Sequence, residues 1–240
     1  MKKRINKHLP NAITCANLFS GCVGVVLAFQ VNLIFAAYAL FLSAILDFFD
    51  GLAARVLKSY STIGKDLDSL ADGLSFGFLP SVIIFQLFSK APPIPNLSPY
   101  IDYIAFLITV FSVLRLAKFN NDTRQTESFI GLPTPANGIM IASFPFILQF
   151  HPAFAPYILN VYVLSVFVLV MCTLLVAELP LMSLKFKNSD FNQNIYRYLL
   201  LMFSAILILF FKFTAVPVII LIYITLSVIQ FKSSNDKVPG

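Results

Sequence analysis

The chain has 240 residues, of which 58% are hydrophobic and 12% are charged, and its 17 Lys and Arg against 11 Asp and Glu give a formal net charge of +6. Soluble domains average roughly 25% charged and 45–50% apolar residues, and a chain this short has too much surface to hide the apolar surplus in one core. The composition excludes a soluble globule, a disordered segment and a collagen-like rod, and it predicts an all-α integral membrane protein that crosses the bilayer several times.

Apolar stretches predict about eight membrane-crossing helices. A crossing helix needs about 20 mostly apolar residues. The uncharged run 9–46 would be about 57 Å long as one helix, so we expect it to turn back at the polar residues 30–32. Loops are expected at the Pro-rich segment 91–99 and at 131–137. The expected helices cover residues 12–29, 33–53, 64–87, 98–117, 136–150, 154–177, 195–212 and 215–231, and counts of six or seven stay open.

Basic residues favour an even number of crossings with both termini in the cytoplasm. Lys and Arg collect in short cytoplasmic loops of membrane proteins. With eight crossings and a cytoplasmic N-terminus, all of them except Lys90 and Lys212 fall on the cytoplasmic side. Residues 1–10 are expected to lie along the anionic leaflet as a basic juxtamembrane segment, and the chain 1–240 is expected to form a single membrane-embedded catalytic domain.

Five acidic residues crowd into positions 47–72: Asp47, Asp50, Asp66, Asp68 and Asp72. An ionisable group in a membrane helix costs several kcal/mol unless it is paired or functional. Asp47 and Asp50 are three residues apart, and Asp68 and Asp72 are four apart, so each pair shares a helix face. Helix-end carboxylates facing water would explain Asp50 or Asp66 alone. Four carboxylates on neighbouring antiparallel helices instead predict one or two divalent cations as the counter-charge.

The spacing of this cluster resembles a known family motif. It is Asp47-x-x-Asp50-Gly51-x-x-Ala54-Arg55, eight further residues, then Gly64-x-x-x-Asp68-x-x-x-Asp72, which is similar at every position to the defining motif of the CDP-alcohol phosphotransferase family. Over roughly residues 9–140 the chain also resembles the membrane phosphatidylserine synthase branch, in Asn11-x-x-Thr14-x-x-Asn17, LDSLADGLSFGFLPS (67–81), RLAKFN (115–120) and FIGLPTPAN (129–137). The resemblance implies the family fold, with the catalytic motif 47–72 on the second and third helices.

The resemblance also implies the reaction. The phosphatidyl group of CDP-diacylglycerol would pass to the hydroxyl of L-serine by metal-assisted direct displacement, giving phosphatidylserine and CMP. Metal ligands are implied at Asp47, Asp50, Asp68 and Asp72, around two ions of Mg²⁺ or Mn²⁺, with Ca²⁺ as an alternative. Asp72 is also implied as the general base, because a serine hydroxyl is a weak nucleophile until a positioned group takes its proton.

Further residues are expected to hold the two substrates. The resemblance implies contacts with the CDP-lipid for Asn11, Thr14, Gly51, Ala54, Arg55 and Ser61. On the residues alone, small side chains also suit helix packing, Asn11 and Thr14 suit capping, and Arg55 suits an anchor at the cytoplasmic interface. Acceptor contacts are expected from Asn120 and from Arg115, for which an interfacial basic residue is the simpler interpretation.

Two other functions stay open. The first is the same family with another acceptor: glycerol 3-phosphate, inositol phosphate or choline. A phosphorylated acceptor would call for more basic residues than 115–124 supply. The second is a cation transporter, against which the carboxylates gather at one membrane face rather than at mid-depth. We expect membrane lipids as partners, no nucleic acid, a homodimer by resemblance, and a place in the plasma (inner) membrane of a prokaryote with the active site facing the cytoplasm.

Overall fold

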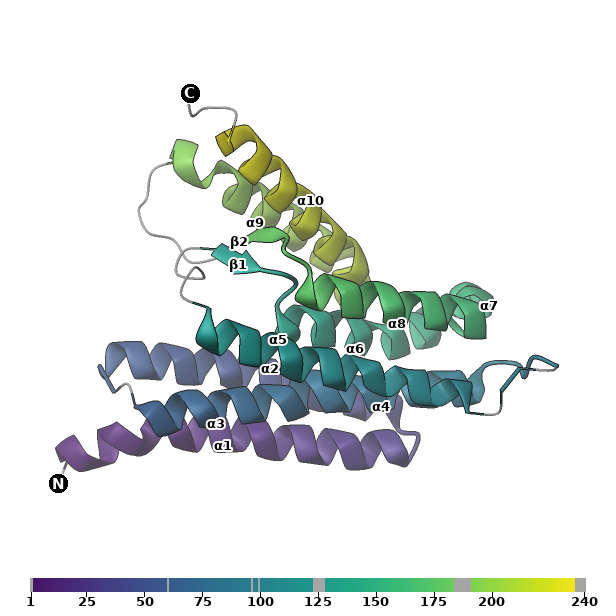
Figure 1. Cartoon of the computed structure of the whole chain (residues 1–240), viewed down its shortest axis with the longest axis horizontal. Helices are drawn as coiled ribbons and strands as arrows, with labels where there is room; N and C mark the ends of the chain where they lie inside the picture. The colour runs from purple at the N-terminus through teal and green to yellow at the C-terminus, as the bar shows by residue number, and fades with distance from the viewer. Residues whose placement is uncertain are drawn as a thin grey trace.

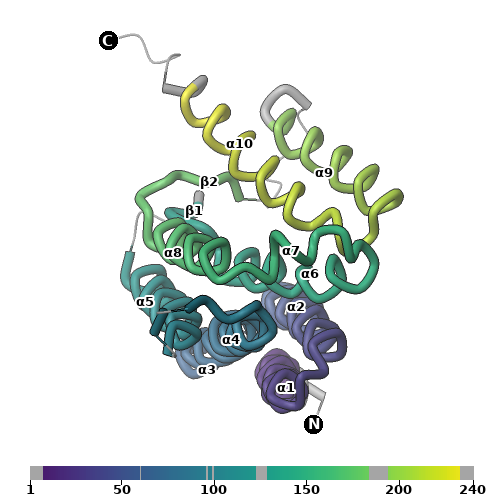
Figure 2. The backbone as a smooth tube through the Cα atoms, turned by 90° about the vertical axis from the view of Figure 1, so that its right-hand side faces the viewer, coloured from purple at the N-terminus to yellow at the C-terminus, as the bar shows by residue number. Residues whose placement is uncertain are grey.

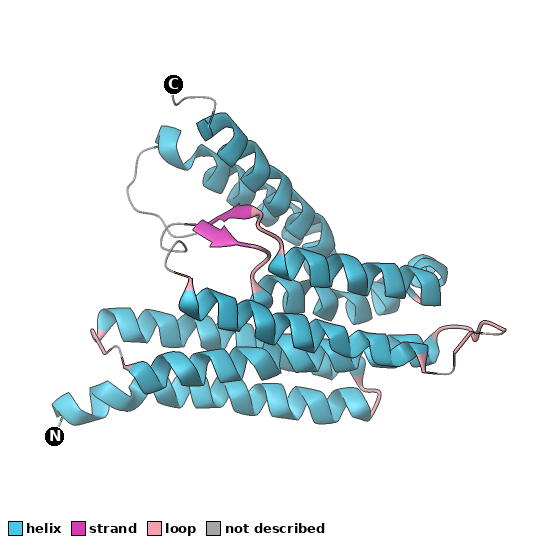
Figure 3. Cartoon of the chain, in the orientation of Figure 1, coloured by secondary structure: helices cyan, strands magenta, loops and turns pink. Residues whose placement is uncertain are grey.

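The computed structural model describes residues 2–59, 61–95, 97–98, 100–122, 128–183 and 191–235, and these residues are almost all helical (Figure 3). The longer helices are α1 (Lys2–Phe29), α2 (Leu33–Val56), α3 (Thr62–Asp72), α4 (Leu79–Lys90), α5 (Leu107–Asn121), α6 (Thr134–Phe150), α8 (Val161–Val176), α9 (Phe191–Phe211) and α10 (Val216–Asn235). A short α7 (Ala155–Ile158) and two strands, β1 (Ser128–Ile130) and β2 (Pro180–Met182), complete the fold. The predicted all-α class is confirmed.

The buried face of α2 shows how one helix can serve both the core and the site. Its buried residues begin at Leu33 and recur at Ala36, Ala37, Leu40 and Ser43, the three-and-four spacing of a single helix face. The same face ends in a buried carboxylate, Asp50. The helix therefore carries its acidic end from the apolar core into the site without changing face.

A continuous helical segment from Thr62 to Lys90 lies at the centre of the bundle. In its most apolar window 72% of the residues are buried, against 6% for Asn194–Lys232. A π-helical turn, Gly73–Phe78, joins α3 to α4 directly after Asp72, and single π turns inside helices are frequent at functional sites. Figure 2 shows α4 lying between α5 on one side and α1 and α2 on the other, with α9 and α10 at the edge of the molecule.

The apolar helices agree with a protein that crosses a membrane several times. Among the described residues, four helical stretches are long and apolar enough to cross: His8–Phe29, Leu33–Val56, Thr62–Lys90 and Asn194–Lys232. A fifth arises if α6 and the bent segment Pro152–Ile158 count as one. The last stretch contains both α9 and α10, which lie side by side (Figures 1 and 2) on either side of a turn where Lys212 has a φ of 51°. The count of eight crossings stays a prediction.

Several predicted boundaries are wrong, each for a local reason. The first helix begins at Lys2 rather than at residue 12. The helix predicted over 154–177 begins at Val161, because the Asn160 side chain accepts hydrogen bonds from two backbone N–H groups and caps it. The preceding residues Pro152–Ile158 instead fold back at 114° to α6. The side chains of Lys2, Lys3, Arg4 and Lys7 in the predicted juxtamembrane segment lie outside the described part of the chain.

A small antiparallel β-sheet ties the α9–α10 pair to the bundle. Ser128 of β1 pairs with Met182 of β2. From α10, the Tyr223 hydroxyl donates to the Met182 carbonyl at 3.0 Å, and the Ser227 hydroxyl accepts from the Met182 N–H at 3.2 Å. The sheet lies between α5 and the α9–α10 pair in Figure 1, and these bonds fix the loop 128–133 beside the site.

Gly131 has a left-handed backbone conformation, so a substitution there tests how strongly the fold depends on this loop. Gly131 has a φ of 77°, and a Cβ placed there would lie 2.6 Å from the Leu175 carbonyl oxygen. We expect Gly131→Ala to lower the free energy of unfolding by about 2 kcal/mol or more, since the left-handed conformation alone costs a residue with a side chain about 1–2 kcal/mol. Thermal unfolding in detergent would measure the loss. Gly51→Ala is the matched control, because its added methyl group would meet no neighbouring atom. An unchanged unfolding midpoint in Gly131→Ala would contradict the prediction.

Candidate active site

Three carboxylates converge where α2 ends and α3 begins. One oxygen each from Asp47, Asp50 and Asp68 lies within 4.8 Å of the other two. Asp47 and Asp50 come from the last turns of α2, and Asp68 comes from the middle of α3. The i, i+3 spacing on one helix and the antiparallel packing of the next bring the three together, as the sequence predicts.

This cluster fits a divalent cation. Two ionised carboxylates this close repel each other by about 3 to 4 kcal/mol at an effective dielectric constant of about 20, so an empty cluster of three is costly. The ligands on offer are all carboxylate oxygens, which suit hard ions such as Mg²⁺, Mn²⁺ and Ca²⁺. The residues present therefore match the predicted class of metal.

Asp72 lies one helical turn further along and is almost fully buried. It borders the same cavity, of about 520 Å³, as the other three carboxylates, although it is not one of the three whose oxygens lie within 4.8 Å. Its Oδ1 atom has no hydrogen-bond partner among the described residues. Asp72 therefore borders the cavity and keeps one carboxylate oxygen whose capacity to accept a hydrogen bond is unused by the described residues.

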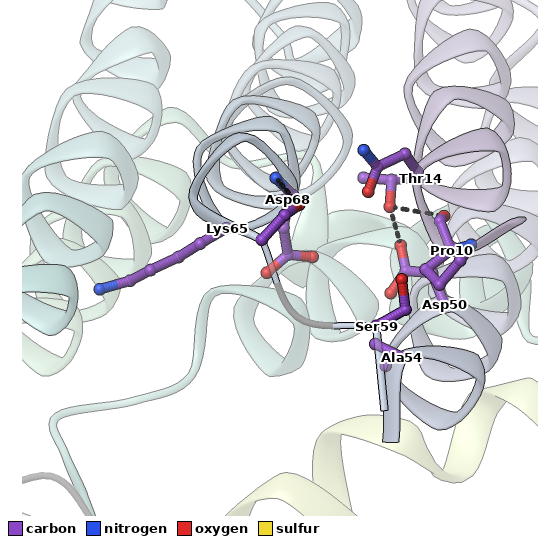
Figure 4. A pocket seen from close by; sticks show the side chains of 11 residues that line it. Pro10, Thr14, Asp50, Ala54, Ser59, Lys65 and Asp68 are labelled. Carbon is purple, nitrogen blue, oxygen red and sulfur yellow. Dashed lines mark hydrogen bonds between the residues drawn. The ribbon is translucent and has the colours of Figure 1, made fainter. Parts of the chain in front are cut away.

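A second hollow, of about 220 Å³, adjoins the carboxylates (Figure 4). It is lined by five of the six residues predicted to contact the CDP-lipid: Asn11, Thr14, Gly51, Ala54 and Ser61. The sixth, Arg55, lines the larger cavity instead, and its Nε donates to the Gly51 carbonyl at 2.9 Å. The six predicted residues therefore line two neighbouring hollows, which share Gly51 and Ala54 in their walls.

Hydrogen bonds give two of these residues a local structural role as well. The Thr14 hydroxyl lies 2.6 Å from Oδ2 of Asp50, which joins α1 to the carboxylate cluster (Figure 4). The Ser61 hydroxyl accepts from the Gly64 N–H at 3.0 Å and caps α3. Ser61 is thus already engaged in starting the helix that carries Asp68.

Gly51 is not a packing glycine. A Cβ built on it would meet no atom within 4 Å, so no neighbouring helix requires its small size. A built Cβ on Gly64, by contrast, would lie 3.0 Å from both Asn11 Oδ1 and Ser61 Oγ. The two motif glycines therefore differ: Gly64 permits close packing, and Gly51 leaves space on the wall of both hollows.

The predicted acceptor residues lie on α5 at the opposite wall of the larger cavity. Arg115 is only 5% exposed, its Nη1 donates to the Thr134 hydroxyl at 3.2 Å, and its guanidinium carbon lies 5.6 and 5.9 Å from the ring centroids of Phe119 and Phe129. Such burial is inconsistent with the simpler interpretation of Arg115 as an interfacial anchor. Asn120 Nδ2 donates to Ser69 Oγ at 2.8 Å, which ties α5 to α3.

Two polar residues of this region were missed from the sequence. Lys65 lines both hollows, and its Nζ donates to the Asn120 carbonyl at 2.9 Å; Figure 4 shows its side chain extending away from Asp50 and Thr14. The position of Lys65 between the motif residues Gly64 and Asp68 was the available sequence signal for its place in the site. Thr134, which holds Arg115, sits in the FIGLPTPAN segment, but only its contact with α5 reveals the role.

Comparison with known families matches residues 7–179 to the CDP-alcohol phosphatidyltransferase family. The chain belongs to this family. The matched residues include the four aspartates of the site and Arg115, and the match ends directly before β2. The resemblance drawn from the 47–72 motif is therefore confirmed at the level of the family.

Curated relatives in this family carry related names. The chain is 32% identical to the CDP-diacylglycerol–serine O-phosphatidyltransferase of Bacillus subtilis (strain 168) over 139 residues, 58% of this chain and 76% of the relative. It is 32% identical to the protein of the same name in Helicobacter pylori (strain 26695) over 134 residues, 55% of this chain and 54% of the relative. The archaetidylserine synthase of Methanothermobacter thermautotrophicus is 31% identical over 138 residues, 57% of each protein. The chain thus spans about half the length of the last two relatives.

Proposed function

We propose that this protein transfers the phosphatidyl group of CDP-diacylglycerol to L-serine, forming phosphatidylserine and CMP. The observation that carries the proposal is the convergence of Asp47, Asp50 and Asp68 beside a hollow lined by the other residues of the family motif. Membership of a transferase family favours this reaction over a cation transporter. Relatives named as serine phosphatidyltransferases support serine as the acceptor.

Each group of residues around the site would have a separate role in the reaction. Asp47, Asp50 and Asp68 would hold a divalent cation, with Asp72 as a fourth ligand, and such an ion neutralises charge that develops on a departing phosphate. Asn11, Thr14, Gly51, Ala54 and Ser61 would contact the CDP-lipid from the smaller hollow. Arg55, at the mouth of the larger one, would contact its phosphates through the guanidinium fork.

Asp72 would act as the general base. Its unpaired Oδ1 would accept the serine hydroxyl proton while the serine oxygen attacks the phosphorus next to the lipid. The new oxygen–phosphorus bond forms as the bond to CMP breaks, and CMP leaves with the electron pair. Arg115, across the cavity, would bind the serine carboxylate.

The test is CMP release by the purified full chain in detergent. CDP-diacylglycerol and Mg²⁺ or Mn²⁺ are supplied, with and without L-serine, and we expect release that depends on serine and yields phosphatidylserine. Release driven instead by glycerol 3-phosphate, an inositol phosphate or choline would keep the family reaction and replace the acceptor. No release with any of these alcohols, from folded protein with metal, would refute the enzyme.

The empty space at Gly51 yields a prediction that separates packing from substrate contact. Gly51→Ala should leave folding intact or raise the free energy of unfolding by about 0.5–1 kcal/mol, because alanine suits a helix better than glycine. It should raise the KM for CDP-diacylglycerol several-fold, because the added methyl group fills the hollow. Kinetics and thermal unfolding on one preparation would measure both. A lower midpoint with unchanged KM would contradict the assignment.

The membrane orientation, cellular location and oligomeric state of the enzyme form part of the same proposal. We propose that both termini and the active site face the cytoplasm of a prokaryotic cell, in the inner membrane, on the distribution of basic residues. A single catalytic domain and a homodimer are further proposals that rest on the resemblance to the family. Cysteine accessibility to a membrane-impermeant reagent at the tip of either terminus would test the orientation.

A further inference from the structure

A closed ring of hydrogen bonds joins α3 to α5 on the wall of the larger cavity. The Lys65 ammonium group donates to the Asn120 backbone carbonyl at 2.9 Å. The Asn120 side-chain amide donates to the Ser69 hydroxyl at 2.8 Å, and the Ser69 hydroxyl donates to the Lys65 backbone carbonyl at 3.2 Å. All three residues line the cavity of about 520 Å³ that the four aspartates of the site also line. The ring is therefore part of the site itself.

The three bonds form one consistent chain of donors and acceptors. A hydroxyl group has a single hydrogen to donate, and Ser69 gives its hydrogen to the backbone of its own helix. Ser69 therefore accepts from α5, which fixes the Asn120 amide with its nitrogen toward α3. Hydrogen bonds linked in this way strengthen one another. The side-chain nitrogen of Asn120 is engaged between the two helices, which favours a positioning role over the predicted contact with the acceptor.

The ring bridges two helices whose main packing partners are other elements. The helix α3 packs against α1 and the π-helical turn, whereas α5 packs against that turn and against α8. The Lys65 side chain extends away from Asp50 and Thr14 (Figure 4), and its Nζ reaches the backbone of α5. The spacing between these ends of α3 and α5 therefore depends on side chains that cross from one helix to the other.

The ring lies within about two helical turns of the groups that would handle the acceptor. Ser69 is three residues before Asp72 on α3, and Asn120 is five residues after Arg115 on α5, which correspond to about 4.5 and 7.5 Å along the helix axes. In the proposed function Asp72 takes the proton of the serine hydroxyl and Arg115 binds the serine carboxylate. A methylene group and the α-carbon separate these two groups of serine. The spacing between α3 and α5 therefore decides which acceptors reach both residues.

We propose that Lys65, Ser69 and Asn120 are positioning residues that set this spacing and thereby select the acceptor by its length. They act through Asp72 and Arg115 and not by contact with the reacting atoms. The ring holds these two residues at a separation that suits L-serine and that leaves L-homoserine, one methylene longer, poorly aligned. This role rests on the proposed function and adds to it a source of specificity for acceptor size.

Breaking the ring should change the use of the acceptor and leave the use of the donor unchanged. In CMP-release assays, Ser69→Ala and Asn120→Ala should each raise the KM for L-serine about threefold to tenfold, the usual worth of one hydrogen bond, with the KM for CDP-diacylglycerol unaltered. One extra methylene changes specificity by about tenfold or more in a fixed pocket, so the preference for L-serine over L-homoserine should shrink by a similar factor. Ser69→Thr keeps the hydroxyl and should restore both values.

Two matched controls remove the same chemical groups outside the ring. Ser89→Ala removes a hydroxyl that also bonds to the carbonyl four residues earlier, and Asn121→Ala removes an amide whose hydrogen bond stays within α5. Both controls should match the unsubstituted protein. The double variant Ser69→Ala/Asn120→Ala should show no larger change than either single variant, because residues that share one bond do not contribute additively.

Thermal unfolding of each variant separates positioning from a purely structural role. A lower unfolding temperature with an unchanged KM for serine and an unchanged preference over L-homoserine would overturn the positioning role and leave the proposed function intact. Effects that add in the double variant, or an equal rise in the KM for both substrates, would also overturn it. CMP release that ignores serine in the unsubstituted protein would overturn the proposed function and the positioning role together.

Discussion

Asp72→Asn should reduce serine-dependent CMP release by about 10²–10⁴-fold, the usual contribution of a positioned general base. The substitution keeps the size of the side chain and removes the ability to take a proton. It also replaces a buried carboxylate whose Oδ1 has no partner among the described residues with a neutral amide. We therefore expect the variant to unfold at a temperature no lower than the unsubstituted protein in metal-free buffer, because removing a buried unpaired charge does not cost stability.

The rate of CMP release and the unfolding temperature of Asp72→Asn should be measured on one preparation. Asp66→Asn, the same chemical change at an exposed position of α3, is the control and should retain full release. An Asp72→Asn protein that is both inactive and unfolded would point to a structural role for this carboxylate. Near-normal release from a folded variant would remove Asp72 from the role of base.

The second large effect concerns the metal cluster. Asp68→Asn removes one of three carboxylates whose oxygens lie within 4.8 Å of one another. A divalent ion at a reacting phosphate contributes several kcal/mol, and each 1.36 kcal/mol is tenfold in rate, so we expect a loss of about 10²–10³-fold. Chelation of divalent ions should cause a loss at least as large in the unsubstituted protein, with recovery on adding Mg²⁺ or Mn²⁺.

Metal binding can also be followed without turnover. An ion that binds only the folded state raises stability by about 2.7 kcal/mol at a concentration 100 times its Kd. The unfolding temperature of the unsubstituted protein should therefore rise with Mg²⁺ or Mn²⁺ and fall again with chelator, and Asp68→Asn should lose most of the rise. An equal rise in the variant would exclude Asp68 as a ligand.

The sequence predicted the acidic cluster because its information is local. Asp47 and Asp50 share a face of one helix by spacing alone, and a short turn to an antiparallel helix brings Asp68 to the same place. The six predicted CDP-lipid contacts came instead from the resemblance to the family, and two of them, Asn11 and Thr14, lie on α1, distant in sequence from the cluster.

Features that depend on distant segments were out of reach. The three-residue strands β1 and β2 are too short for an alternating pattern, and β2 begins with Pro180. The contact of Thr134 with Arg115 arises only because α6 lies beside α5, which no local pattern predicts. The helix predicted over 154–177 begins later, at Val161, because the Asn160 side chain caps it. Hydropathy gives no sign of such a hydrogen bond.

The π-helical turn Gly73–Phe78 has a consequence for comparing sequences within the family. Such a turn accommodates one residue more than regular α-helical bonding, and each residue of an α-helix turns the chain by about 100°. Deleting a single residue here would let the segment close into an unbroken helix, yet it would swing Asp68 and Asp72 away from Asp47 and Asp50 while α4 kept its packing. A one-residue gap at this point in a relative therefore marks a rebuilt active site, even where every motif aspartate is still present.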